Sequence, residues 1–207
     1  MSSLRDRKKE RTRQALVDAA ADLFDRRGYD QTTVADIAAA ADIGTRTFFS
    51  YFASKEEILF PESDARVKAA EDAIAARRPG DRPADVLLRA LREVGETSTD
   101  MTGRLAALRM RLMQTVPAVR GRGLQIQLDA QRDIAQRLHA AFPDELDEVA
   151  AAALVGAFVG AIMGALAALF DEAQPASPEQ LRDRLRQATD IALRPWAVTQ
   201  DRGEKGS

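Results

Sequence analysis

Apolar residues recur at helical spacing in the first part of the chain. The stripe is formed by Leu16, Ala19, Ala20, Leu23 and Phe24. Positions i, i+3, i+4, i+7 and i+8 lie on one face of an α-helix, so the pattern predicts a helix from about Arg7 to Arg27. Gly28 follows directly, and glycine is the usual residue just after a helix C-terminus. We therefore expect an amphipathic first helix that ends at Gly28.

A second, short helix and a tight turn are predicted next. Thr32 or Thr33 is placed to cap this helix, since a threonine hydroxyl can accept a hydrogen bond from a free amide of the first turn. Its inward-facing residues would be Val34, Ile37, Ala38 and Ala41. Asp42 and Gly44 flank the turn, and both residue types tolerate positive φ.

A third helix is expected from Thr45 to about Phe52. Ser54 and Glu57 then have the spacing of a capping box for a fourth helix. Short helices with a tight turn between the second and third are typical of a helix-turn-helix unit.

Beyond Phe60 the predicted helices are longer and prolines separate them. We expect helices over residues 62–78, 83–99, 103–114, 118–140, 145–172 and 177–194. The last is marked by Ser177 as N-cap, Pro178 in the first turn and Gln180 at the capping-box position. The fold class is therefore all-α, with a three-helix helix-turn-helix domain over residues 1–60. A larger six-helix bundle would follow over residues 61–198, with a loose tail over 199–207.

The composition narrows the chemistry. The 207 residues contain no cysteine and one histidine, His139. Disulfides, thiolate metal sites and cysteine nucleophiles are thereby excluded, and a histidine-centred catalytic site is disfavoured. We expect no enzyme activity, no cofactor and no metal. The polar, basic N-terminus does not have the pattern of a secretory signal, so a cytoplasmic protein is expected.

Basic residues gather at the start of the chain although the formal net charge is −2. They are Arg5, Arg7, Lys8, Lys9, Arg11 and Arg13. Such a run is either a solvated terminus or an arm that contacts nucleic-acid phosphates.

The third predicted helix has the features of a DNA-reading helix. Phe48 and Phe52, four residues apart, would anchor it to its own domain. Thr45, Arg46 and Thr47 would be exposed, and an arginine can donate two hydrogen bonds to a guanine edge. Thr33 and Lys55, at two helix starts, could hold phosphates together with backbone amides. The alternative is that residues 1–60 form a helical cap without a partner.

The stretch TTVADIAAAADIGTRTFFSYFASKEEIL, from Thr32 to Leu59, resembles the helix-turn-helix of the TetR family nearly residue for residue. The similarity extends back over ALVDAAADLFDRRGYDQTTV and so covers about the first sixty residues. The remainder resembles the family in length and helix number. The resemblance implies a ligand-responsive transcriptional regulator, most often a repressor, that binds palindromic double-stranded operator DNA as a homodimer.

The resemblance also implies which side chains meet DNA. They are Arg7, Lys8, Lys9, Thr33, Thr45, Arg46, Thr47, Phe49, Tyr51 and Lys55. Two positions depart from the family. Phe49 stands where a tyrosine hydroxyl usually binds a phosphate, and Tyr51 either replaces it or packs. Gly44 replaces the usual small polar residue.

The segment Val149–Phe170 contains no charged residue and is long enough to span a membrane. Acidic flanks on both sides and the abundance of Ala and Gly argue against that interpretation. Small residues recur every four positions, at Ala152, Gly156, Gly160, Gly164 and Ala168. This small-residue ridge would allow close approach of another helix. With the last helix it resembles the family's four-helix dimer interface; packing within the same chain is the alternative.

The resemblance further implies a ligand cavity in the C-terminal bundle. Its candidate lining residues are Leu105, Leu108, Leu112, Met113, Leu128, Phe158, Ile162 and Met163. The segment RTFFSYFASKEEILF is similar to regulators linked to acyl-CoA or mycofactocin metabolism, so an acyl-CoA-like effector is one candidate. Two other classes of protein are the alternatives to a regulator. A helical enzyme would need titratable groups inside the bundle, and a membrane sensor would need detergent for its extraction.

Overall fold

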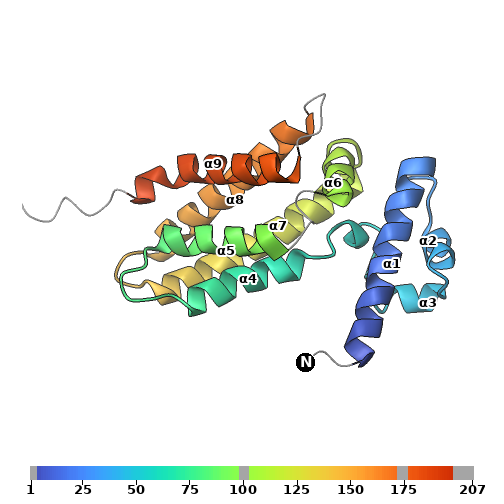
Figure 1. Cartoon of the computed structure of the whole chain (residues 1–207), viewed down its shortest axis with the longest axis horizontal. Helices are drawn as coiled ribbons and strands as arrows, with labels where there is room; N and C mark the ends of the chain where they lie inside the picture. The colour runs from blue at the N-terminus through green and yellow to red at the C-terminus, as the bar shows by residue number, and fades with distance from the viewer. Residues whose placement is uncertain (1–3, 98–102, 172–176, 198–207) are drawn as a thin grey trace, which may run out of the picture. The chain divides into compact units, whose positions relative to one another are not determined.

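The computed structural model describes residues 4–97, 103–171 and 177–197, and their regular secondary structure is helical (Figure 1). The all-α prediction is confirmed. The helices are α1 (Leu4–Arg27), α2 (Val34–Ala40), α3 (Thr45–Phe48), the 3-10 turn η1 (Glu57–Leu59), α4 (Ser63–Ala75), α5 (Pro83–Thr97), α6 (Arg104–Thr115), α7 (Pro117–Ala141), α8 (Glu148–Asp171) and α9 (Pro178–Ala197).

The chain divides into two units. The first comprises Met1–Pro61 with Arg104–Gly123, and the second comprises Glu62–Gly103 with Leu124–Ser207. Sequence reasoning expected a boundary at residue 60 and placed everything from 61 to 198 in one bundle. The structure instead groups α6 and the first residues of α7 with the helix-turn-helix. The predicted tail, 199–207, lies outside the described residues.

The ends of α1 and α2 follow the expected local rules. Gly28 has φ +85° and its amide donates to Phe24 O at 3.0 Å, which closes α1. Thr33 caps α2, accepting a hydrogen bond from the Asp36 amide at 3.1 Å. Asp42 has φ +55°, as the turn required, but Gly44 has φ −76°. Gly44 is therefore extended backbone before α3, and of these two residues it is Asp42 that adopts the positive φ.

The third helix is shorter than predicted. After Phe48 the backbone tightens, since the amides of Ser50 and Tyr51 donate three residues back, at 3.0 and 2.9 Å. Ser54 accepts from the Glu57 amide at 3.3 Å, but the next element is the three-residue turn η1 and not a full helix. The helical spacing of Phe48 and Phe52 is kept through this tightened turn.

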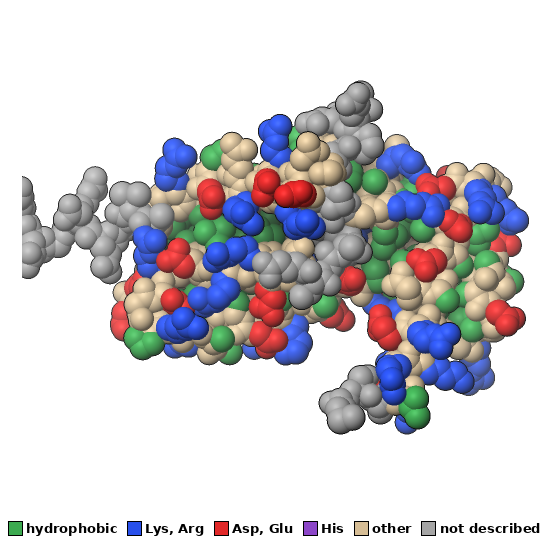
Figure 2. Space-filling model, in the orientation of Figure 1, with side chains coloured by type: hydrophobic (Ala, Val, Ile, Leu, Met, Phe, Trp, Pro, Cys, Tyr) green, Lys and Arg blue, Asp and Glu red, His purple; other side chains and the backbone are tan. Residues whose placement is uncertain are grey.

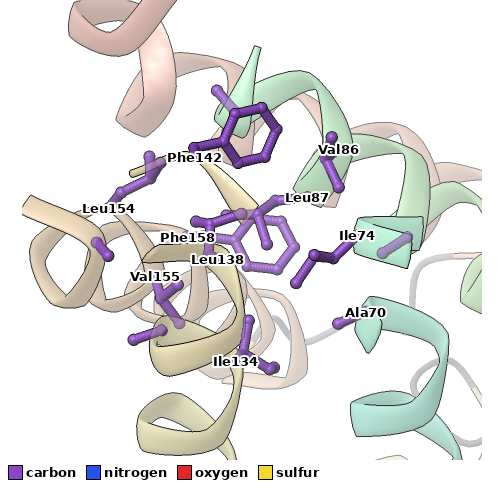
Figure 3. Packing of buried hydrophobic residues seen from close by; sticks show 14 of the residues in the cluster. Ala70, Ile74, Val86, Leu87, Ile134, Leu138, Phe142, Leu154, Val155 and Phe158 are labelled. Carbon is purple, nitrogen blue, oxygen red and sulfur yellow. The ribbon is translucent and has the colours of Figure 1, made fainter. Parts of the chain in front are cut away.

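The core of the second unit forms where α4, α5, α7 and α8 meet. Figure 3 shows the side chains of Leu87, Leu138 and Phe158 converging there, with Ile74 beside them. Burial of such side chains contributes about 1.5–3 kcal/mol each. Trp196 packs against the same cluster, because α9 continues through Pro195 to Ala197 and does not end at residue 194 as predicted.

The last helix begins as the sequence predicted. The Ser177 hydroxyl accepts from the Gln180 amide at 3.2 Å, and Gln180 Oε1 accepts from the Ser177 amide at 2.8 Å. Leu181 and Leu185 of α9 are buried, and α9 packs along α8. These two helices therefore form a pair within the second unit.

Candidate nucleic-acid interface

Two aromatic residues hold the recognition segment, residues 45–52, to the rest of the first unit. Phe48 is fully buried and Phe52 is 2% exposed, with ring centroids 5.9 Å apart. The core residues Leu16 of α1 and Ile37 of α2 are fully buried in the same unit. The predicted anchoring role of Phe48 and Phe52 is confirmed.

The opposite face of this segment is exposed. Thr45, Arg46 and Thr47 are exposed, as predicted, and Phe49 is 54% exposed. Tyr51 is half-buried. Hydrogen-bond donors and one apolar ring therefore lie together on a surface that the fold leaves uncovered.

Lys55 is engaged inside the first unit. Its ammonium donates to the carbonyls of Tyr29 and Thr32, at 2.9 and 3.0 Å, and lies 3.8 Å from the centroid of the Tyr29 ring. The Tyr29 hydroxyl donates to Glu56. Burial is the largest cause that raises the pKa of Tyr29, and this hydrogen bond is the next. Lys55 thus fixes the loop after α1. Only one of its three donors is left for a phosphate.

The hydroxyl and amide of Thr33 are also engaged. Both donate to Asp36 Oδ2, at 2.6 and 2.9 Å. Hydrogen bonds from Thr33 hold the pKa of Asp36 below its usual value, so a carboxylate already occupies this helix start. A phosphate near Thr33 would meet a negative charge. Sequence reasoning named Thr32 or Thr33 as the cap but missed Asp36.

Lys and Arg side chains gather over the N-terminal end of α1, as Figure 2 shows. From Leu4 onward these residues are helical and exposed, so the described part of the predicted arm is the first turns of α1. Arg7, Lys8 and Lys9 remain predicted phosphate contacts.

Arg13 differs from the other basic residues of α1. It is half-buried, with its guanidinium carbon 4.6 Å from the centroid of the Phe52 ring. It donates to the carbonyl of Pro61 and, at 3.4 Å, to that of Tyr51. Arg13 therefore joins α1 to the end of the recognition segment, a role that sequence reasoning missed because its partners lie 38 and 48 residues away.

Glu57 connects the same region to α7. One carboxylate oxygen accepts from the Ala53 amide and the other from Arg122, at 2.8 Å. Ala53 directly follows Phe52, so this carboxylate fixes the backbone where the recognition segment ends. The sequence predicted Ser54 and Glu57 as a capping box, and the Glu57 amide does donate to the Ser54 hydroxyl, but the Glu57 carboxylate accepts from the Ala53 amide.

Helix α6 is tied to α1 and η1 by arginines. Arg104 bonds Asp22 at 2.6 Å and Asp25 at 2.8 Å, and Arg111 bonds Asp25 at 2.6 Å. Arg109 is buried and donates to the Leu59 carbonyl at 3.1 Å. Desolvation would raise the pKa of Asp25, but the hydrogen bonds from Arg104 and Arg111 outweigh it and the net pKa is lowered. These contacts explain why α6 belongs to the first unit.

The eight predicted ligand-lining residues do not gather at one site within a unit. Leu105, Leu108, Leu112 and Met113 belong to the first unit, and the other four to the second. The Met113 side chain packs against Gly123, since a Cβ added at Gly123 would lie 2.9 Å from Met113 Cε. Leu128 is 59% exposed, and its role as a ligand contact stays a prediction. Phe158 lies in the core of the second unit.

A cavity of about 240 Å³ lies between α4 and α5. Its lining includes Arg66, Lys68, Asp72 and Glu93, and none of the predicted ligand residues. Lys68 and Asp72 pair across one helical turn at 2.9 Å. Ala65, Ala69 and Val94 also line it, so charged and apolar side chains both face this cavity.

The small-residue ridge of α8 is open. A Cβ added at Gly156, Gly160 or Gly164 would meet no described atom within 4 Å. By length and composition Glu148–Phe170 could cross a membrane, with a mean hydropathy of 2.3 and 28% of the window buried. Larger side chains of the same helix are packed inside the second unit, however, since Leu154, Val155 and Leu166 are buried.

Comparison with known proteins identifies relatives of this chain. Residues 16–60 match the model described as bacterial regulatory proteins, tetR family. The HTH-type transcriptional regulator TcmR of Streptomyces glaucescens is 33% identical over 150 residues, which is 70% of this chain and 66% of that protein. The chain thus spans slightly less than two thirds of the length of this relative.

Solved structures share the fold of most of the chain. A TetR-family transcriptional repressor, FadR of Thermus thermophilus in complex with lauroyl-CoA, has a TM-score of 0.59 at 21% identity, covering 94% of this chain and all of that one. A TetR-family regulator from Syntrophomonas wolfei has a TM-score of 0.63 at 18% identity, covering 89% and 96%. At these identities the likeness extends to the fold alone.

Proposed function

Because this chain belongs to the TetR family of bacterial regulatory proteins, we propose that it is a cytoplasmic repressor that binds palindromic operator DNA as a homodimer. A small, mainly apolar ligand in the C-terminal bundle would release it from DNA. The relatives are named as transcriptional regulators, which favours DNA binding over catalysis.

The observation that carries this proposal is the exposed face of the recognition segment. Thr45, Arg46 and Thr47 are exposed on a segment whose opposite face is held by Phe48 and Phe52. Arg46 is the residue best suited to read a base, since its planar fork matches the two acceptors of guanine.

Two Arg46 variants test the proposal on a duplex selected by the protein from a random pool. Arg46→Ala is expected to lose about 1–3 kcal/mol of discrimination between that duplex and random DNA. Arg46→Lys keeps the charge but not the fork, so it should keep random-DNA affinity and lose discrimination. Arg132→Ala, at an exposed position of α7, is the matched control. Equal losses on both DNAs would make Arg46 a phosphate contact only.

The dimer proposal is supported by the open ridge of α8. Gly156, Gly160 and Gly164 have open space where a Cβ would lie. A glycine inside a helix is destabilising by about 1 kcal/mol relative to alanine, so a packing reason is expected. Close approach of α8 from a second copy would supply that reason. Val149 and Ile191, 77% and 59% exposed on α8 and α9, would be covered in the same assembly.

An acyl-CoA is one class of effector to test on this chain. Lauroyl-CoA is bound by the Thermus protein. Half-buried Ile162 and Met163 of α8 remain candidate contacts for its acyl chain. An increase in melting temperature with lauroyl-CoA, absent with free coenzyme A, would support this class.

A further inference from the structure

Phe49 is an apolar side chain on a surface that is otherwise polar. It follows the last residue of α3 and is 54% exposed, whereas Phe48 and Phe52 on either side are buried. Its amide donates to the Thr45 carbonyl at 3.4 Å, so the helical turn continues through it. Residues four apart share a helix face. Phe49 therefore lies on the exposed face with Thr45 and not on the anchored one.

The ring of Phe49 is oriented by an aromatic contact. It meets the ring of Phe48 edge-on, with centroids 5.4 Å apart and planes at 83°. Phe48 is fully buried and fixed, so one edge of Phe49 is supported and more than half of its surface faces outward. A phenylalanine has no hydroxyl and cannot hydrogen-bond a phosphate. What it offers to DNA is an oriented apolar surface.

We propose that Phe49 contacts the C5-methyl group of a pyrimidine in the major groove, and thereby favours thymine at one position of each operator half-site. This inference rests on the proposed DNA-binding function. The thymine methyl is the apolar feature among the base edges of that groove, and the other features are hydrogen-bonding groups that Thr45 and Arg46 can serve. A 5-methylcytosine presents the same group, so the chemistry recognised is the methyl and not the base pair.

The test uses a duplex selected by the protein in which thymines are replaced one at a time by deoxyuridine. This removes the methyl and keeps the base pair. Replacing the contacted thymine should weaken binding roughly three- to fivefold per half-site, the equivalent of one buried methyl. Phe49→Ala should bind both duplexes equally, while Phe49→Tyr, which keeps the ring, should retain the preference. Replacing the thymine by 5-methylcytosine should retain more affinity than replacing it by cytosine.

The outcomes separate this inference from the function it rests on. Suppose that the wild-type protein prefers its selected duplex, but no deoxyuridine substitution weakens its binding more than it weakens the binding of Phe49→Ala. The methyl contact is then wrong, and sequence-specific DNA binding stands. If Phe49→Ala weakens all duplexes alike, including random ones, the ring contacts the sugar-phosphate backbone and the inference is overturned. If the wild-type protein binds every duplex equally, the proposed function itself fails. Circular dichroism of Phe49→Ala checks that the exposed ring is not needed for folding.

Discussion

Replacing Arg13 by alanine should weaken DNA binding through the fold of the first unit and not through the removal of a charge. The guanidinium donates to the Pro61 carbonyl and lies 4.6 Å from the Phe52 ring centroid. A hydrogen bond from a charged donor contributes about 1.5–3 kcal/mol, and a partly exposed cation–π contact about 0.5–1 kcal/mol. The second bond, to Tyr51 at 3.4 Å, is long and adds little.

These contributions give an expected decrease of about 2–4 kcal/mol in the free energy of unfolding, measured by urea denaturation and circular dichroism. Arg13→Lys keeps the charge but not the fork that spans two carbonyls, so its decrease should be about half as large. Arg11→Ala, an exposed neighbour on α1, is the control for stability.

Salt dependence separates the structural role from a phosphate contact. Under a structural role, Arg13→Ala lowers operator affinity while the slope of log K against log salt is unchanged. Unaltered stability, together with a slope reduced by about 0.9, would refute this account of Arg13 and place it among the phosphate contacts.

Three further changes test other parts of the structure. Deleting residues 1–9 should weaken binding to all DNA and reduce the salt slope by about 0.9 for each phosphate that the protein no longer neutralises, in a titration of affinity against salt. A Cβ added at Gly160 meets no described atom within 4 Å, so circular dichroism of Gly160→Leu should show a folded helix while sedimentation shows a monomer; a full dimer would contradict the ridge as interface. Since the pKa of Asp25 is lowered, its ion pairs stabilise the first unit above about pH 4 and are lost as pH falls through that pKa. Asp25→Asn should therefore make the free energy of unfolding depend less on pH in the acid range. An unchanged acid transition would show that Asp25 does not contribute to it.

Local rules predicted what depends on neighbouring residues. Gly28, Asp42 and the Ser177–Gln180 capping box were found where the sequence placed them, because each needs only a few adjacent residues. The anchors Phe48 and Phe52 follow from helical spacing in the same way. The recognition helix was predicted too long, since spacing does not distinguish an α-helical turn from the tighter turn that comes after Phe48.

Contacts between distant segments could not be predicted in this way. Arg104 meets Asp22 across 82 residues and Arg122 meets Glu57 across 65, and no periodicity in one sequence reports such pairs. The single-bundle expectation failed for the same reason, because arginines of α6 bind it to the first unit. Likewise, Lys55 was predicted to hold a phosphate, and the sequence does not indicate that its ammonium donates to the carbonyls of Tyr29 and Thr32.

The central claim is that two copies of this chain read one operator, and the mass of the protein–DNA complex tests it most directly. Sedimentation of the intact protein with a duplex that it selects should give two chains per duplex. Footprinting should show a palindrome with half-sites about 10–10.5 base pairs apart, or a multiple of that spacing, as two symmetric recognition segments require. A complex of one chain per duplex, or equal affinity for the selected duplex and random DNA, would contradict the account.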